Sequence, residues 1–312
     1  MKVDQVRRVA VVGAGMMGHG IAQEFACAGY TVHLHDLSEK ILQQAVRKMQ
    51  DNLQMLVDAG CVTSGQAEHA LTNVHTSTVL QDVVADVDVV IEAVFEDLAL
   101  KQQVFQELDK LCPQRTILAS TTSAVLPSKL ASVTQRPDKV VVTHFDNPPY
   151  LLPLVEVVRN EKTSDETVIF ICNLLRSAGK APVIVQKEVP GFIENRLLAA
   201  LFREAMSIVA KGIASPQDVD TVIKTGFGRR SPVAGIFESY EIAGWDLVFP
   251  GVSRLLPEID SSLEFPPGLR EKVERGELGV KTGKGFYEWT PESAEALRQR
   301  ILQALVQMAR WS

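Results

Sequence analysis

The segment RVAVVGAGMMG near the start of the chain constrains the possible folds most strongly. Its first five residues, Arg8–Val12, are mostly apolar and β-branched, which predicts a buried strand. Gly13, Gly15 and Gly18 then fit the spacing G-x-G-x-x-G, and residues 17–28 have the apolar periodicity of a helix. The glycine pattern alone is weak, but a strand before it and a helix after it predict the first unit of a dinucleotide-binding sheet.

The three glycines and a later carboxylate have the roles of a dinucleotide site. Gly13 would allow the tight turn, and Gly15 would let backbone N–H groups approach a pyrophosphate at the positive end of the helix. Gly18 would let the helix pack closely on the strand. Asp36 ends the predicted second strand, where a carboxylate accepts hydrogen bonds from the ribose hydroxyls and repels the extra phosphate of NADP. These features favour NAD; the alternative is a glycine turn that binds no ligand.

The first half of the chain alternates predicted strands and helices. Further strands are expected at residues 30–34, 87–94, 116–120 and 140–143, with helices at 38–56 and 98–111. This alternation predicts a doubly wound α/β fold whose mostly parallel sheet is covered on both faces. From about residue 188 the segments are helical, at 192–211, 215–226 and 294–311. We therefore predict a Rossmann-type NAD-binding domain over residues 1–187 and a smaller all-helical C-terminal domain over 188–312.

The charge balance narrows the partners of the chain. Lys and Arg number 32 against 38 Asp and Glu, so the formal net charge is −6. An acidic chain argues against nucleic acid and against an anionic membrane surface as partners. The cysteines lie far apart, without the spacing of zinc ligands or of a disulfide framework, and no metal site is expected. With no signal peptide and no apolar run long enough to cross a bilayer, we expect a cytoplasmic protein.

The segment VVTHFDNPPYLLPLVEVV, residues 141–158, holds a candidate catalytic pair. His144 follows a predicted strand at its carboxyl end, where open parallel sheets bind their ligands. Glu156 lies inside LVEVV, where a buried carboxylate is costly without a partner. A strand–turn–strand path would bring Glu156 back to His144, where it would fix the imidazole tautomer and raise its basicity. The spacing leaves two readings open: a general base with its orienting carboxylate, or a core histidine bonded to a structural glutamate.

Six segments, taken in order, carry a resemblance to a known family. They are VAVVGAGMMGHGIA, IEAVFEDLALK, ASTTSAVLPSKLA, THFDNPPYLLPLVEVV, KEVPGFIENRLL and LGVKTGKGFYEW. The chain resembles the 3-hydroxyacyl-CoA dehydrogenase family over nearly its whole length. The resemblance implies a doubly wound NAD domain followed by a helical domain that binds substrate and makes a homodimer. It also implies that His144 is the general base and Glu156 its partner.

The same resemblance implies roles for further residues. Ser123, in the TTS after a strand, resembles the serine that holds the substrate oxygen, and Asn195 resembles the asparagine that completes the site. The residues expected beside the cofactor are Met16, Met17, Glu96, Lys101 and Asn147, together with the glycines and Asp36. Three of these residues have simpler alternatives. Ser123 could cap a helix, Asn195 could stabilise a helix start, and Lys101 could be a solvated charge.

The substrate has two competing interpretations. The family implies reversible NAD-dependent oxidation of an L-3-hydroxyacyl-CoA such as 3-hydroxybutyryl-CoA, as in fatty acid metabolism. However, the chain has no Lys or Arg between Lys48 and Lys101, and basic contacts provide much of the affinity for a ligand with several phosphates. PSKL and NPPYLLPLVE resemble instead the branch with lambda-crystallin, gulonate dehydrogenase and carnitine dehydrogenase. That branch implies the same chemistry on a free 3-hydroxy acid, including a ring acid, with Arg203 or Arg229–Arg230 as candidate carboxylate ligands. A third hypothesis is an inactive NAD-binding structural protein.

Overall fold

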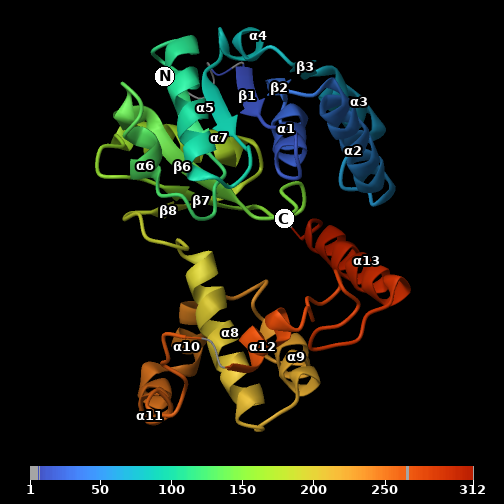
Figure 1. The fold of residues 1–312 in the computed structure, drawn as a ribbon, viewed down its shortest axis with the longest axis vertical. Helices are drawn as coiled ribbons and strands as arrows, with labels where there is room; N and C mark the ends of the chain where they lie inside the picture. The colour runs from blue at the N-terminus through green and yellow to red at the C-terminus, as the bar shows by residue number, and fades with distance from the viewer. Residues whose placement is uncertain (1–5, 7, 265–266, 312) are drawn as a thin grey trace. The chain divides into compact units, whose positions relative to one another are not determined.

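The computed structural model describes residues 6, 8–264 and 267–311, which form two compact units (Figure 1). The first unit holds the described residues up to Ile193 together with those from Ile301 onwards. The second unit runs from Glu194 to Arg300. The first unit contains a sheet with helices and the second is helical, so the predicted fold class is confirmed.

In the described part of the chain, eight strands form one sheet in the order β3-β2-β1-β4-β5-β6-β7-β8. Neighbouring strands are parallel except for β6 and β7, which are antiparallel. The chain moves outward from β1 in one direction through β2 and β3, and then in the other direction from β4 onwards. This is the doubly wound order, and it places a switch point next to β1. The bounds are β1 Arg8–Val12, β2 Thr31–His35, β3 Val74–Ser77, β4 Val89–Glu92, β5 Ile117–Ser120, β6 Val140–Phe145, β7 Leu154–Val158 and β8 Ala181–Val185.

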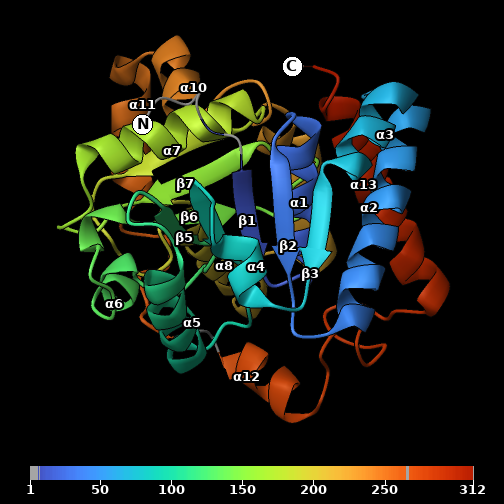
Figure 2. The ribbon, with the colours of Figure 1, turned by 90° about the horizontal axis from the view of Figure 1, so that it is seen from above.

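Helices cover both faces of this sheet, because its central strands are apolar on both sides. Along β1, Val9 and Val11 belong to one buried cluster, whereas Ala10 and Val12 belong to another. This alternation follows from the pleat of a strand, which directs successive side chains to opposite faces. Figure 2 shows β1, β2 and β3 side by side with α1 against them. The helices of this unit are α1 Gly18–Cys27, α2 Glu39–Asp58, α3 Ser64–Thr72, α4 Leu80–Val84, α5 Leu98–Leu111, α6 Pro127–Ala131 and α7 Asp165–Ser177, with the short η2 Pro137–Lys139.

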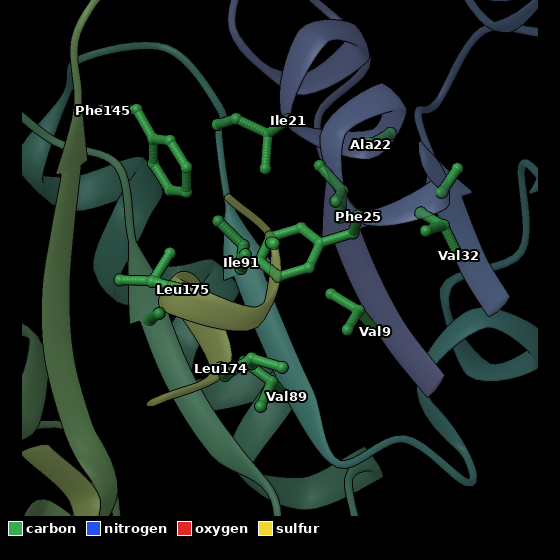
Figure 3. Packing of buried hydrophobic residues seen from close by; sticks show 14 of the residues in the cluster. Val9, Ile21, Ala22, Phe25, Val32, Val89, Ile91, Phe145, Leu174 and Leu175 are labelled. Atoms are coloured by element: carbon green, nitrogen blue, oxygen red, sulfur yellow. The ribbon is translucent and has the colours of Figure 1, made fainter. Parts of the chain in front are cut away.

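The core on one face lies between the sheet and helices α1 and α7. Figure 3 shows the ring of Phe25, from α1, directed towards Ile91 of β4. Leu174 and Leu175 of α7 lie on the same face, near Val89. All of these side chains are buried. Since α1 begins at the glycine turn, its packing against the sheet fixes the position of that turn.

The second unit consists of helices with few buried side chains. Met206, Ser207 and Ala294 are its buried residues in the part of the chain that the structure describes. Helix α9 begins as predicted, since Ser215 accepts a hydrogen bond from the N–H of Asp218 and Pro216 is the first helical residue. The helices are α8 Glu194–Ala210, α9 Pro216–Thr225, η3 Phe227–Arg229, α10 Ile236–Ala243, α11 Trp245–Leu255, α12 Pro267–Glu274 and α13 Pro291–Met308, whose last residues belong to the first unit.

Candidate active site

In the glycine turn between β1 and α1, Gly13 and Gly18 lie against backbone atoms, whereas Gly15 faces open space. Gly13 has φ +104°, and a Cβ added there would lie 2.6 Å from the carbonyl oxygen of Ala93. A Cβ at Gly18 would lie 1.7 Å from the carbonyl oxygen of Gly13. A Cβ at Gly15 would have no heavy atom within 4 Å. The turn therefore has free space above Gly15 at the N-terminal end of α1, as a bound pyrophosphate requires.

Asp36 lies directly after β2 and holds the glycine turn. Its Oδ2 accepts a hydrogen bond from the N–H of Ala14 at 3.0 Å, and its Oδ1 accepts one from Ser38 at 3.2 Å. Its side chain remains half-buried at the carboxyl end of the sheet. The carboxylate thus lies where ribose hydroxyls can donate to it, and the residues of this edge fit a dinucleotide.

The loop after β6 lies against the glycine turn and α1. Asn147 Nδ2 is 4.0 Å from the sulfur of Met16, which is exposed, while Met17 is half-buried at the start of α1. A Cβ added to Gly20 of α1 would lie 2.7 Å from Cγ of Pro149. The structure therefore brings Met16 and Asn147 together at the edge where the cofactor is expected.

The buried ammonium group of Lys180 holds the same loop. Its Nζ donates to the carbonyl oxygen of Pro149 at 2.5 Å and forms an ion pair with Glu24 of α1. Burial raises the pKa of Glu24, although the neighbouring Lys180 lowers it in part. This pair therefore links the cofactor helix to the loop after His144.

His144 and Glu156 face each other across the antiparallel strands β6 and β7. They are directly opposite in the register, and His144 Nδ1 lies 2.8 Å from Glu156 Oε2. The other oxygen of Glu156 accepts a hydrogen bond from the N–H of Ile193 at 2.7 Å. Because a carboxylate only accepts hydrogen bonds, Nδ1 carries the proton and Nε2 keeps its lone pair. Because it keeps its lone pair, Nε2 is the basic atom of the pair. Both side chains are buried, and the ring centroids of His144 and Phe192 are 5.6 Å apart.

Lys101 is buried, so the alternative that it is a solvated charge is wrong. Its Nζ lies 2.8 Å from Glu92 and 3.3 Å from Glu96, which is 42% exposed. Burial by itself raises the pKa of Glu96, but the hydroxyl of Thr122 and the ammonium of Lys101 together lower it below its usual value. The structure thus brings Glu96 and Lys101 together at the carboxyl end of β4.

Ser123 and Asn195 occupy different units. Ser123 is exposed in the segment after β5, which is in parallel register with β6, so the segments holding Ser123 and His144 leave the same edge of the sheet. The residue that caps the following helix α6 is Leu126, not Ser123, so the capping alternative is wrong. Asn195 is half-buried in the first turn of α8, the first helix of the second unit.

The sequence analysis did not single out three buried residues of this edge. Glu92, Ser120 and Thr122 lie at or just after the carboxyl ends of β4 and β5 and share hydrogen bonds. Glu92 stands inside VVIEAV as Glu156 stands inside LVEVV. A carboxylate within a buried strand was the signal that identified Glu156, and the same signal applies to Glu92.

A doubly wound sheet with an open glycine turn and a buried histidine–carboxylate pair defines the class of NAD-dependent dehydrogenases. The family model described as "3-hydroxyacyl-CoA dehydrogenase, NAD binding domain" matches residues 8–189. The model of the C-terminal domain of the same family matches residues 191–289. The chain therefore belongs to the 3-hydroxyacyl-CoA dehydrogenase family, and its cofactor is NAD.

Relatives of this chain include enzymes named for different substrates. One is 5-formyl-3-hydroxy-2-methylpyridine 4-carboxylate 5-dehydrogenase of Mesorhizobium japonicum, 35% identical over 98% of each chain. A crystal structure of that kind of enzyme, described as an NAD+ dependent dismutase, matches with a TM-score of 0.90 over 98% of each chain at 35% identity. The (S)-3-hydroxybutyryl-CoA dehydrogenase of Ralstonia eutropha matches with a TM-score of 0.77 at 33% identity, over 92% of this chain and 100% of its own. No described helix combines the length and apolar character needed to cross a membrane.

Proposed function

We propose that the chain oxidises a small free acid whose reacting carbon bears a hydroxyl, as an alcohol or a hydrated aldehyde, rather than a coenzyme A thioester. The observation that carries this proposal is the absence of Lys and Arg between Lys48 and Lys101. This stretch includes the second half of α2 and all of α3, where Asp51, Asp58 and Glu68 are exposed. A ligand with several phosphates gains affinity from basic contacts, and these carboxylates repel it.

The relatives support the same choice of substrate. The pyridine carboxylate dehydrogenase matches this chain over 98% of both lengths, whereas a probable 3-hydroxybutyryl-CoA dehydrogenase of Bacillus subtilis matches 93% of this chain and 100% of its own. The family models end at residue 289, so helix α13 lies beyond them. A relative of the same full length thus has a name that contains a ring carboxylate and a formyl group, and no thioester.

The end of α13 adds a structural argument. The thiol of Cys61 lies 3.9 Å from the carbonyl oxygen of Val306, and Arg310 Nη2 would lie 3.8 Å from a Cβ added at Gly60. Residues beyond the family models thus contact the connection between α2 and α3. The end of α13 thus occupies part of the surface beside the acidic stretch of α2 and α3, which favours a smaller substrate.

The geometry of the dyad supports the following steps. Bound NAD supplies the acceptor for a hydride from the substrate carbon. Nε2 of His144 takes the hydroxyl proton, and the Glu156 carboxylate stabilises the resulting imidazolium through Nδ1. Ser123 donates a hydrogen bond to the oxygen as it becomes a carbonyl oxygen. With a hydrated aldehyde the product is a carboxylic acid; with a secondary alcohol it is a ketone. A formed dyad also argues against an inactive structural protein.

The thioester reaction is the second candidate. The segment LGVKTGKGFYEW resembles the ending of the thioester enzymes, and several relatives have names that contain coenzyme A. Arg310 also brings one positive charge to the connection between α2 and α3. Under this candidate the same dyad takes the hydroxyl proton during NAD-dependent oxidation of an L-3-hydroxyacyl-CoA, and fatty acid metabolism is the setting.

One assay separates the two candidates. Purified protein is mixed with NAD and a panel of free acids that includes 3-hydroxy acids and ring carboxylates with hydroxymethyl or formyl groups, and NADH formation is followed at 340 nm. In parallel, acetoacetyl-CoA is offered with NADH. We expect turnover of a free ring acid at a kcat/KM well above that for acetoacetyl-CoA. Efficient reduction of acetoacetyl-CoA with no turnover of any free acid would overturn the proposal.

We also propose that the protein is a homodimer through its helical unit. Large apolar side chains are exposed on α10 and α11, among them Phe237, Ile242, Leu247 and Phe249. An extended exposed apolar surface on a soluble unit is typical of an interface, and a second copy is the simplest partner. Sedimentation velocity should show a dimer for the native chain and a monomer for the double variant Phe237→Asp and Leu247→Asp. A native monomer at micromolar concentration would contradict the proposal.

We also propose that the protein is cytoplasmic. The four cysteines are free thiols, and Cys112 and Cys172 are buried. Burial raises the pKa of Cys112 to about 12, so this thiol stays protonated and unreactive. Free thiols of this kind are usual in a reducing compartment.

A further inference from the structure

Four buried polar side chains join the segments that follow β4 and β5. Glu92 and Ser120 end these strands, Thr122 lies two residues beyond β5, and Lys101 comes from α5. Each is at most 1% exposed. A charged carboxylate and a charged ammonium are costly to bury unless both are paired and hydrogen-bonded, so each bond of this cluster matters.

Glu92 is the centre of the cluster on the β4 side. Its Oε1 accepts hydrogen bonds from Lys101 Nζ at 2.8 Å and from the N–H of Val94 at 2.7 Å. Its Oε2 accepts one from the Ser120 hydroxyl at 2.5 Å. Lys101 also donates to the carbonyl oxygen of Val94 at 3.2 Å. The cluster therefore fixes the backbone that leads from β4 to Glu96.

On the β5 side, Thr122 links Ser120 to Glu96. Its N–H donates to the Ser120 hydroxyl at 3.2 Å, and its own hydroxyl donates to Glu96. The same hydroxyl oxygen accepts hydrogen bonds from the N–H groups of Ala124 at 3.2 Å and Val125 at 2.8 Å. Glu96 accepts a further bond from the N–H of Ala124 at 3.1 Å. The residues on both sides of Ser123 are thus held by one hydroxyl and one carboxylate.

Among the five side chains of this network, those of Glu92, Lys101, Ser120 and Thr122 are buried, whereas that of Glu96 is 42% exposed. A ligand that contacts this carboxylate acts on the bonds that it shares with Thr122, Ala124 and Lys101. Hydrogen-bond networks in a low dielectric polarise one another, so a change at one member is felt at the others. Binding of a ligand at Glu96 can therefore shift the backbone around Ser123 through these hydrogen bonds.

We propose that this network couples cofactor binding at Glu96 to the position of Ser123, with Thr122 as the positioning residue. The inference rests on the proposed function in one respect: that Glu96 lies beside bound NAD and Ser123 beside the substrate oxygen. Glu92 and Lys101 support this coupling through the ion pair between them. They hold the two loops in a single arrangement that the cofactor then tightens.

Amide hydrogen exchange of residues 121–126, with and without NADH, tests the coupling directly. We expect NADH to slow exchange in this segment in the native chain and in Thr122→Ser, which keeps the hydroxyl. In the near-isosteric Thr122→Val, the NADH effect should be lost at Val125, whose N–H bonds the Thr122 hydroxyl, and the basal exchange of Val125 should rise about tenfold, as for one lost hydrogen bond. An unchanged NADH effect in Thr122→Val, or no effect in the native chain, would overturn the inference.

Two controls separate this inference from the others. NADH affinity, measured by fluorescence titration, and the thermal midpoint are compared for both variants. If Thr122→Val does not fold, Thr122→Ala, which also lacks the hydroxyl, takes its place with the same expected loss of coupling. With the substrate found in the panel assay, Thr122→Val should lower kcat about tenfold or more with KM for NAD changed little, and Thr122→Ser should restore it. If no substrate turns over, the proposed function fails, whereas the exchange data still decide the coupling.

Discussion

The two units of this protein differ in what they bury. The sheet unit has a buried cluster on each face of the sheet, with side chains such as Phe25, Phe105 and Leu118 almost fully enclosed. The helical unit buries Met206, Ser207 and Ala294 among its described residues and exposes large apolar side chains. The sheet unit therefore carries its own core, whereas the helical unit leaves apolar side chains exposed, which is what the proposed homodimer would bury.

The largest effect that we expect separates chemistry from folding within the sheet unit. His144→Gln removes the basic Nε2 while keeping a side chain that can bond Glu156, so kcat should fall by about 10²–10⁴-fold. NADH affinity and the oligomeric state should stay unchanged, since the glycine turn is intact. Steady-state kinetics and fluorescence titration measure both. Loss of NADH binding in this variant would mean that His144 supports the fold instead.

A matched pair of phenylalanines tests the difference in cores. Phe25→Ala removes a side chain that is 1% exposed and should destabilise the sheet unit by about 3–5 kcal/mol. Phe237→Ala removes one that is 74% exposed in the single chain, so a protein without a partner on this surface should lose little stability. Urea unfolding at low and high protein concentration distinguishes the two. A cost for Phe237→Ala that grows with protein concentration would show that a second copy buries this ring.

The cofactor edge provides a smaller effect. Asp36→Ala removes the acceptor at the end of β2 and should weaken NAD binding by about 1.5–3 kcal/mol, the usual loss for a hydrogen bond to a charged group. It should also reduce the discrimination against NADP, because the repulsion of the extra phosphate disappears. Isothermal titration with both dinucleotides measures this. Equal affinity of the native chain for both would contradict the role of Asp36.

The smallest effect belongs to a helix start in the other unit. Ser215 caps α9 through the N–H of Asp218, so Ser215→Ala should cost about 1 kcal/mol. Ser215→Thr keeps the hydroxyl, which also donates to Asp218 Oδ2 at 2.6 Å, and is the control. Thermal unfolding followed by circular dichroism should show a lowered midpoint for the alanine variant alone. A midpoint that stays unchanged would mean that α9 does not unfold together with the measured transition.

The fold was predictable where the apolar pattern agrees with the residues that begin or end a helix or strand. Arg8–Val12 and Leu98–Leu111 have the bounds expected from the sequence. The sequence analysis missed β3, whose VHTS is a short edge strand with exposed residues and no alternating pattern. It also missed β8, where Pro182 is a residue that weakens a strand assignment. Edge strands bury little, so their sequences carry a weaker signal than those of central strands.

The candidate site was predictable in its strands and less so in its partners. A carboxylate inside LVEVV indicated the pairing of Glu156, and the antiparallel register now shows His144 opposite to it. The burial of Lys101 was not predictable, because a lysine on an amphipathic helix is normally solvated. Its partner Glu92 lies nine positions earlier on a strand, and only the packing of α5 on the sheet brings the two together. The position of Asn195, in the other unit, stays a prediction.

The antiparallel pairing of β6 and β7 has a consequence for how such enzymes diversify. His144 and Glu156 are held by a hairpin of the sheet unit, so the proposed proton-transfer pair lies within one short segment of chain. Substitutions in other segments of the chain can then alter the choice of substrate without disturbing that pair. The proposed proton transfer is thus structurally separate from the choice of substrate. This separation suits a family in which one relative is named for a pyridine carboxylate and another for an acyl thioester.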